Sequence, residues 1–174
     1  MNATAHSEAP LIRPCCDSEV QEIFEIVNDA ASAYKGVIPA DRWHEPYMSM
    51  DELLGQIADD VKFHGCEIDG LLAGVMGIQD KGPVELIRHA YVRSRFRKQG
   101  IGSLLLKRLE AMTAKPILIG TWLDAVWAID FYKKNGYRPL SREETARLLR
   151  RFWKIPERQV ETSIVLADAK WNGL

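Results

Sequence analysis

The sequence has little cysteine, and the positions of its three cysteines exclude the usual disulfide and metal-binding patterns. Cys15 and Cys16 are adjacent, while Cys66 stands alone in an apolar run. No two of them have the spacing of a zinc ligand pair or of a disulfide framework. This usage is typical of a reduced compartment, so we expect a cytoplasmic protein without a metal, in which Cys66 is a small buried apolar residue.

Long apolar runs and an excess of charge are also missing. No run approaches the roughly 18 apolar residues of a membrane span, and the start, MNATAHSEAP, has no apolar signal core. The formal net charge is −1, whereas nucleic-acid binders usually carry a marked basic excess. We therefore expect no membrane or nucleic-acid partner, a loose tail at residues 1–9, and a single domain at residues 10–174.

The composition is that of an ordinary globular protein, with 47% apolar and 27% charged residues, and the order of the elements along the chain predicts an α/β (α+β) domain. Strand patterns occur at residues 11–13, 61–68, 71–79, 84–92, 117–122, 137–140 and 160–167. Helix patterns occur at residues 18–35, 49–57, 101–114, 125–135 and from 141 onward. A strand meander that feeds a strand–helix–strand unit predicts a mixed sheet with helices on its faces.

Local signals mark several of the boundaries. Predicted capping boxes pair Ser18 with Gln21, Ser49 with Glu52, and Ser141 with Glu144. Asp69-Gly70 favours a two-residue hairpin turn, and Gly136 is a helix C-cap signal.

The stretch RFRKQGIGSLLL, residues 95–106, is a basic turn with two glycines that enters a helix. It lacks the Lys-Ser/Thr pair of a P-loop, and Leu105 stands where a dinucleotide fingerprint needs its third glycine. It does meet R/Q-x-x-G-x-G/A through Arg97, Gly100 and Gly102. Glycines at a helix N-terminus let a pyrophosphate approach free backbone N–H groups, although the same pattern also fits a plain strand-to-helix corner.

Neighbouring residues favour the pyrophosphate. Residues 90–110, AYVRSRFRKQGIGSLLLKRLE, resemble the cofactor motif of the GNAT superfamily of acyl-CoA-dependent N-acetyltransferases. Residues 128–140, AIDFYKKNGYRPL, are similar to its second signature, A-x-x-F-Y-x-x-x-G-[FY], and one strand separates the two, as in the family. The chain departs from the family pattern where Arg93-Ser94 replaces a common proline and Ala125 an asparagine.

The resemblance implies a mostly antiparallel twisted sheet of about seven strands, with a splayed cofactor gap between the fourth and fifth. It also implies transfer of an acetyl group from acetyl-CoA to a primary amine of a small molecule or peptide, by direct attack in a ternary complex. A homodimer is a family-level expectation, and a catalytically silent acyl-CoA-binding domain is the alternative function. The residues expected to bind the cofactor are Ala90, Tyr91, Val92, Arg97, Lys98, Gln99, Gly100, Ile101, Gly102, Ser103, Ala128, Phe131 and Tyr132.

The same resemblance makes Tyr132 the candidate general acid for the CoA thiolate, against the alternative that it is a core aromatic. The base is open. His89 has a suitable unperturbed pKa and Glu85 is a second candidate, but a packed histidine or a water chain fits as well. Strand alternation places Glu85, His89 and Tyr91 on one face and Arg88 on the other, unless a bulge resets it.

The segment YKGVIPADRWHEPYM, residues 34–48, flanks the acceptor cleft in the family and is rich in aromatic and charged residues. Carboxylates beside aromatic rings suit a cationic amine, although the same aromatics can merely cap the core. The candidate acceptor-binding residues are Tyr34, Trp43, His44, Glu45, Tyr47, Arg88 and Trp122. Trp127 can also line this cleft or belong to the core.

Overall fold

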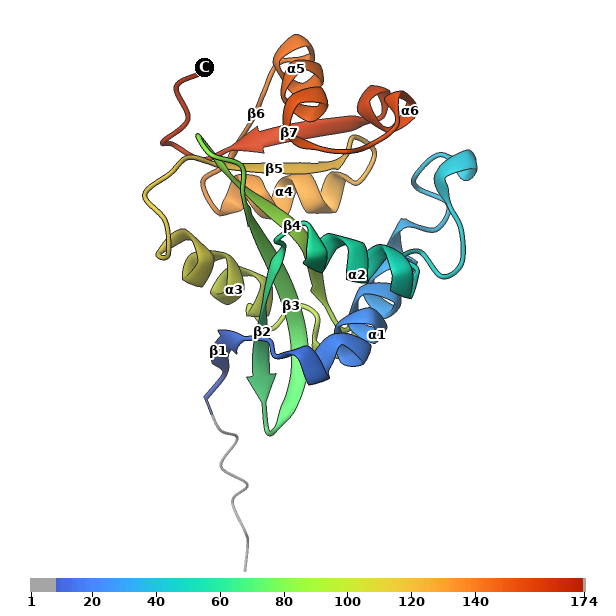
Figure 1. Ribbon diagram of the computed structural model, residues 1–174, viewed down its shortest axis with the longest axis vertical. Coiled ribbons are helices and arrows are strands. Elements are labelled where there is room, and N and C mark those ends of the chain that lie inside the picture. The colour runs from blue at the N-terminus through green and yellow to red at the C-terminus, as the bar shows by residue number, and fades with distance from the viewer. Residues whose placement is uncertain (1–8, 174) are drawn as a thin grey trace, which may run out of the picture.

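The computed structural model describes residues 9–173 of the chain. In this part, seven strands form one continuous sheet (Figure 1). The strands are β1 (Leu11–Pro14), β2 (Lys62–Ile68), β3 (Leu71–Asp80), β4 (Glu85–Val92), β5 (Ile117–Trp122), β6 (Arg138–Pro139) and β7 (Ser163–Ala167). They lie in the order β1-β2-β3-β4-β5-β7-β6, and every neighbouring pair is antiparallel except β4 and β5. The expected mixed, mostly antiparallel sheet is confirmed. The tail expected at residues 1–9 lies, apart from its last residue, outside the described residues.

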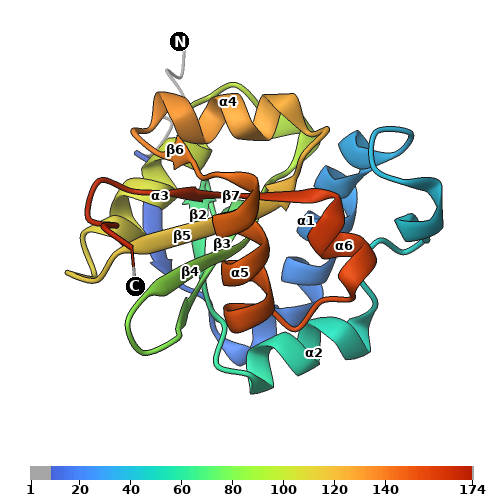
Figure 2. The ribbon, with the colours of Figure 1, turned by 90° about the horizontal axis from the view of Figure 1, so that it is seen from above.

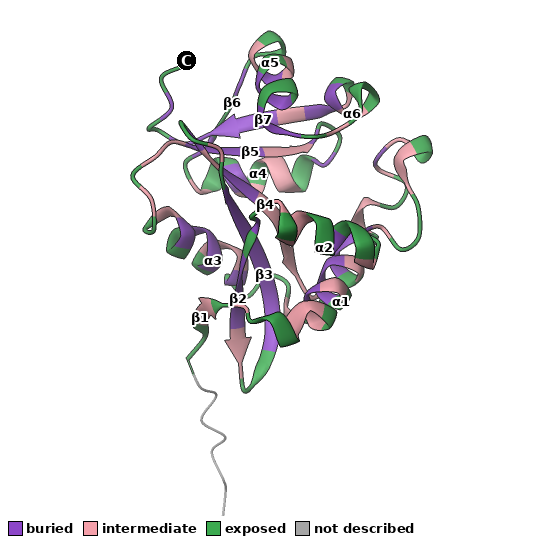
Figure 3. Ribbon diagram, viewed as in Figure 1, coloured by how far each residue is buried: buried purple, intermediate pink, exposed green. Residues whose placement is uncertain are grey.

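Helices cover both faces of this sheet (Figure 2). They are α1 (Val20–Ala31), α2 (Met50–Ala58), α3 (Ile101–Glu110), α4 (Val126–Lys134), α5 (Arg142–Phe152) and the short α6 (Glu157–Glu161). One face packs on α3 and α4 through residues such as Met76 and Ile87. On the other face Val75 lies against α1 and α2, and Leu86 lies against α5. Adjacent strand residues thus enter opposite cores, and β3 is buried over most of its length (Figure 3).

The predicted boundaries depend on local hydrogen bonds, and most of them are confirmed. The hydroxyl oxygens of Ser49 and Ser141 accept from the backbone N–H groups of Glu52 and Glu144, at 3.1 and 3.2 Å. Asp69 and Gly70 both have positive φ, as a two-residue hairpin turn requires.

Three of the predicted boundaries were wrong. The first capping box forms two residues earlier than predicted, because the Glu19 carboxylate accepts from the Cys16 backbone N–H at 2.7 Å. Helix α3 ends at Glu110 instead of Ala114. The last strand begins at Ser163 instead of Val160, because residues 157–161 form α6 after Pro156.

Strands β4 and β5 separate after three paired positions, and this divergence positions the site. Their register runs from Glu85 opposite Ile117 to Ile87 opposite Ile119 and goes no further. The expected splayed gap between the fourth and fifth strands is confirmed. Beyond it, the edge of β4 toward β5 has backbone groups without a strand partner.

A β-bulge at His89 changes the direction of the β4 side chains at this gap. Gly77 of β3 pairs with Arg88, and Val75 pairs with Tyr91, so two residues of β4 face the single Met76. His89 has a φ of +51°, a conformation that non-glycine residues rarely adopt. Simple alternation would separate Arg88 from His89, whereas the bulge lets both line one cavity.

Candidate active site

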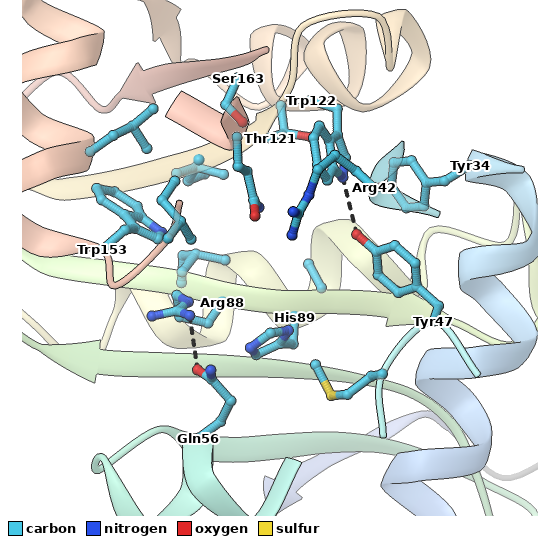
Figure 4. A pocket seen from close by; sticks show the side chains of 18 of the residues that line it. Tyr34, Arg42, Tyr47, Gln56, Arg88, His89, Thr121, Trp122, Trp153 and Ser163 are labelled. Carbon is cyan, nitrogen blue, oxygen red and sulfur yellow. Dashed lines mark hydrogen bonds between the residues drawn. The ribbon is translucent and has the colours of Figure 1, made fainter. Parts of the chain in front are cut away.

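A cavity of about 280 Å³ lies where β4 and β5 separate (Figure 4). Its walls come from these two strands, from α2, from the segment at residues 34–48, and from the connection between α5 and α6. The lining side chains include Tyr34, Arg42, His44, Tyr47, Gln56, Arg88, His89, Thr121, Trp122, Tyr132, Trp153 and Ser163. Its volume suits a small ligand or the end of a longer one.

The glycine turn that precedes α3 has the shape of an anion cradle. Gly100 is the N-cap residue of α3 with a φ of +80°, and a Cβ added there would meet no atom within 4 Å. Lys98 also has a positive φ, +61°. The first N–H groups of α3 have no partner within the helix, and the helix dipole favours negative charge there. The turn therefore has both the open space and the donors that a pyrophosphate needs.

The second glycine joins this turn to α4. A Cβ on Gly102 would lie 3.2 Å from Cζ of Phe131, so any side chain there would require the ring to shift by a few tenths of an ångström. The Phe131 ring in turn packs edge-to-face on the ring of Tyr132, with centroids 5.0 Å apart. Tyr132 lines the cavity. The two signature stretches of the sequence thus meet directly.

Other residues expected at the cofactor divide between backbone and side-chain roles. Arg97 is exposed, and its guanidinium donates to the carbonyl of Ala30 in the last turn of α1 at 2.9 Å, which fixes the basic turn to that helix. Lys98 and Gln99 are exposed. Ile101 is buried in the core, so its backbone N–H is the group that remains for a ligand.

The remaining expected cofactor residues lie around the same gap. Ala90 and Tyr91 line the cavity. The side chain of Val92 lies beside Gly102, 4.0 Å from where a Cβ on that glycine would be. Ser103 is half-buried in the first turn of α3, and Ala128 packs beside Trp122.

Tyr132 is buried, with 7% of its surface exposed, and its hydroxyl makes no hydrogen bond within residues 9–173. Burial raises the pKa of this phenol well above its ordinary value, and the neighbouring Tyr34 adds to the effect. A phenol of this kind stays protonated at neutral pH. It can therefore donate to a strong base formed inside the cavity.

His89 also faces the cavity, and its ring stacks on Phe63 with centroids 6.0 Å apart. Its Nε2 is buried and has no hydrogen-bond partner in the described part of the chain. Burial lowers the pKa of this imidazole to about 3, with the charge of Arg88 as the second cause. The ring is thus neutral at neutral pH, and its tautomer decides whether Nε2 accepts or donates a hydrogen bond.

Glu85, the second candidate base, lies at the other end of β4. It is opposite Asp80 of β3 and Ile117 of β5, and it does not line the cavity. Burial raises the pKa of its carboxyl, and the charge of Asp80 raises it further. The structure does not bring this carboxyl to the other candidate residues.

Four of the expected acceptor residues from outside β4 come together at the cavity: Tyr34, His44, Tyr47 and Trp122. The Trp122 indole donates to the Tyr47 hydroxyl at 3.0 Å (Figure 4). The rings of Tyr34 and Tyr47 stack with centroids 5.9 Å apart. This aromatic cluster forms one wall of the cavity.

The carboxylates that suggested a cationic acceptor do not line the cavity. Glu45 is exposed and pairs with Lys35 at 2.5 Å, and it also accepts from the indole of Trp43. Asp41 accepts from Arg158 of α6 at 3.2 Å. Trp43 packs beside Tyr47 without reaching the cavity, and Trp127 is exposed beside Tyr34.

Sequence reasoning missed several lining residues, above all Arg42, Gln56 and Trp153. Arg42 lies in the segment at residues 34–48. In the sequence it follows Asp41, and two adjacent opposite charges are typical of an exposed surface pair. Trp153 packs on Gly120 of β5, where a Cβ would lie 3.2 Å from its ring. No pattern in the sequence predicts that contact, because it joins elements far apart along the chain.

Within residues 9–173 no cluster of three or more histidine, cysteine, aspartate or glutamate side chains is arranged to hold a metal. None of the helices in that range is long and apolar enough to cross a membrane.

The fold and the paired signatures are those expected from the resemblance to the GNAT superfamily, and comparison with known families agrees. Residues 22–151 match the acetyltransferase (GNAT) domain. The chain belongs to this family. A comparison with curated proteins finds no match.

Solved structures with the same fold include the PaiA N-acetyltransferase of Thermoplasma acidophilum in complex with coenzyme A. It has a TM-score of 0.69 and 17% identity, over 94% of this chain and 100% of that one. A GNAT acetyltransferase of Staphylococcus aureus Mu50 has a TM-score of 0.66 and 19% identity, over 92% and 98% of the two chains. A GNAT acetyltransferase of Elizabethkingia anophelis with acetyl-CoA bound has a TM-score of 0.58 and 20% identity, over 91% and 97%.

Proposed function

We propose that this chain transfers an acetyl group from acetyl-CoA to the primary amine of a small molecule or peptide, by direct attack of the amine in a ternary complex. The observation that carries the proposal is the position of Tyr132. Its ring packs on Phe131, which contacts Gly102 of the glycine turn, and Tyr132 also lines the cavity. A protonated phenol thus lies in the cavity, and Phe131 connects it to the anion cradle.

The residues around the gap fit coenzyme A. The open turn at Gly100 and the N-terminus of α3 would hold the pyrophosphate, with Lys98 at its edge. The β4 backbone from Ala90 to Val92, which has no partner in β5, would pair with the pantetheine arm. When bound, the cofactor supplies an acetyl thioester, whose carbon–sulfur bond is the one to be broken.

The chain's own residues provide for the proton transfers. A carbon–nitrogen bond forms as the carbon–sulfur bond breaks, the amine loses a proton, and the departing sulfur gains one. We assign the donation to the sulfur to Tyr132, which then recovers a proton from solvent. We assign to His89 the orientation of the amine, through a neutral Nε2 that accepts a hydrogen bond from it. The amine's proton leaves through water in the cavity.

The test is release of free thiol from acetyl-CoA in the presence of polyamines, amino acids, aminoglycosides and peptides. The proposal predicts thiol release that depends on at least one amine, together with a product heavier by one acetyl group in mass spectrometry. Tight binding of coenzyme A without release with any amine would favour a catalytically silent acyl-CoA-binding domain instead.

A further inference from the structure

The cavity contains more positive than negative charge. Its charged lining side chains are Arg42, Arg88, Lys154 and Glu52. Lys154 pairs with Asp59 at 2.6 Å, and Glu52 is exposed on the first turn of α2. Neither arginine has a carboxylate within 4.0 Å in the described part of the chain. Two guanidinium groups therefore face one small cavity without a carboxylate in ion-pair contact among the described residues, and the charges of Glu52 and Asp59 act on Arg88 only from a greater distance.

Arg88 is held in place by neutral groups only. Its guanidinium donates to Oε1 of Gln56 at 2.8 Å (Figure 4) and to Oε1 of Gln79 at 2.9 Å. Gln79, with 1% of its surface exposed, is itself fixed because its Nε2 donates to the Asp59 carboxylate at 2.9 Å. These bonds use two of the five N–H donors of Arg88, so the planar guanidinium is held in one orientation and still has donors for a ligand.

Burial without a carboxylate is costly for this group. Burial lowers the pKa of the Arg88 guanidinium, since the charged form loses hydration that the two amides replace only in part. An anionic ligand would restore the missing countercharge. The guanidinium is thus placed to form an ion pair with an anionic ligand.

Arg42 approaches the same space from the opposite wall. It ends the 3-10 turn at residues 40–42, and Figure 4 shows its side chain pointing into the cavity between Thr121 and Tyr47. Its Nε is buried and has no hydrogen-bond partner among residues 9–173. The ion pair between the adjacent Asp41 and Arg158 of α6 holds this turn over the cavity. A buried donor without a partner is rare in native proteins and points to a ligand.

Resting on the proposed acetyl transfer, we infer that the acceptor is a small amino acid-like molecule whose carboxylate is bound by Arg42 and Arg88 while its amine faces Tyr132 and His89. Planar guanidinium forks match a carboxylate in geometry and in charge. Besides Glu52 and Lys154, the rest of the lining adds neutral aromatic rings and hydroxyl groups, which place the amine.

The experiment compares each free α-amino acid with its carboxamide as acceptor, by thiol release from acetyl-CoA. The pair shares the amine and the side chain and differs in one charge. The carboxamides of aspartate and glutamate keep a side-chain carboxylate, so they distinguish recognition of that group from recognition of the α-carboxylate. We expect kcat/KM to be at least about tenfold higher for the form with the recognised carboxylate, mostly through KM.

Variants assign this preference to the two arginines. Arg42→Gln removes a charge that has no partner in the fold, so it should fold normally and reduce the acid-to-carboxamide ratio toward one. Arg88→Lys keeps a charge but loses the fork, and it should reduce the same ratio by a smaller factor. Arg147→Gln is the matched control, because Arg147 is exposed on α5 outside the cavity, and this variant should keep the wild-type ratio.

Two results would overturn the inference: carboxamides or polyamines turned over as well as the free acids, or an unchanged ratio in Arg42→Gln. If no amine at all is acetylated, the proposed function fails. The inference about the carboxylate is then tested by equilibrium binding of each amino acid and its carboxamide to the CoA-loaded protein. Equal affinity for acid and carboxamide in that titration contradicts it.

Discussion

Gly102 and Phe131 lie so close together that a Cβ on the glycine would stand 3.2 Å from the edge of the aromatic ring. The first residue belongs to the turn expected to bind a pyrophosphate, and the second belongs to the aromatic pair that contains Tyr132. This contact physically joins the two stretches that identify the family. A substitution at either residue should therefore alter the geometry of both the cofactor cradle and the cavity.

Gly102→Val should force α3 and α4 apart, because the added methyl groups cannot fit against the ring. We expect a loss of about 1–3 kcal/mol of folding stability and about tenfold weaker binding of coenzyme A, measured by denaturation and calorimetric titration. Gly55→Ala is the control, since a Cβ there meets nothing within 4 Å. Unchanged affinity in Gly102→Val would mean that the cradle does not depend on this contact.

Gly100→Ala separates backbone strain from blockage of the cradle. Gly82 is a matched position, with a φ of +82° against +80° at Gly100, and at both a Cβ would meet no atom within 4 Å. Both alanine variants should lose about 1–2 kcal/mol of stability from the left-handed backbone. Only Gly100→Ala should weaken the binding of coenzyme A as well. Equal affinities in the two variants would count against a pyrophosphate at Gly100.

The elements and caps were largely predictable from the sequence because the interactions that determine them are local. Ser49 and Ser141 cap helices three residues ahead of their partners, and Asp69-Gly70 forms its hairpin from its own backbone preference. The glycine turn and the Phe131–Tyr132 pair were likewise readable as short patterns. The first helix start was misjudged because Glu19 competes with Gln21 as the box residue.

The composition of the cavity was much less predictable, because it depends on contacts between distant elements. The bulge at His89 brings Arg88 and His89 to one cavity, and alternation alone cannot locate it. Arg42 reaches the same cavity from a turn whose Asp41 pairs with Arg158, 117 residues along the chain. Such pairings depend on the closed fold, so the sequence suggested a cationic acceptor where the structure has free arginines.

The half-buried His89, whose Nε2 is fully buried, makes stability depend on pH in a defined direction. Its pKa is lowered from 6.5 to about 3, so between these values the folded state binds fewer protons than the unfolded state. Its contribution is therefore complete above about pH 6.5 and is lost as the pH falls toward 3. His89→Asn should reduce the difference in unfolding free energy between pH 7 and pH 4.5, measured by urea denaturation. The same difference in both proteins would contradict a neutral histidine in the folded state.

Protonation of the departing thiolate by Tyr132 is tested by the variant Tyr132→Phe at saturating acetyl-CoA. The hydroxyl makes no hydrogen bond within residues 9–173, so its removal should leave folding and coenzyme A affinity nearly unchanged. We expect kcat for thiol release to fall by about 100-fold. Tyr137→Phe is the control, because that hydroxyl donates to Glu110 at 2.9 Å and does not line the cavity, and this variant should lose stability and keep kcat. A Tyr132→Phe protein with wild-type kcat would show that this hydroxyl does not protonate the leaving thiolate.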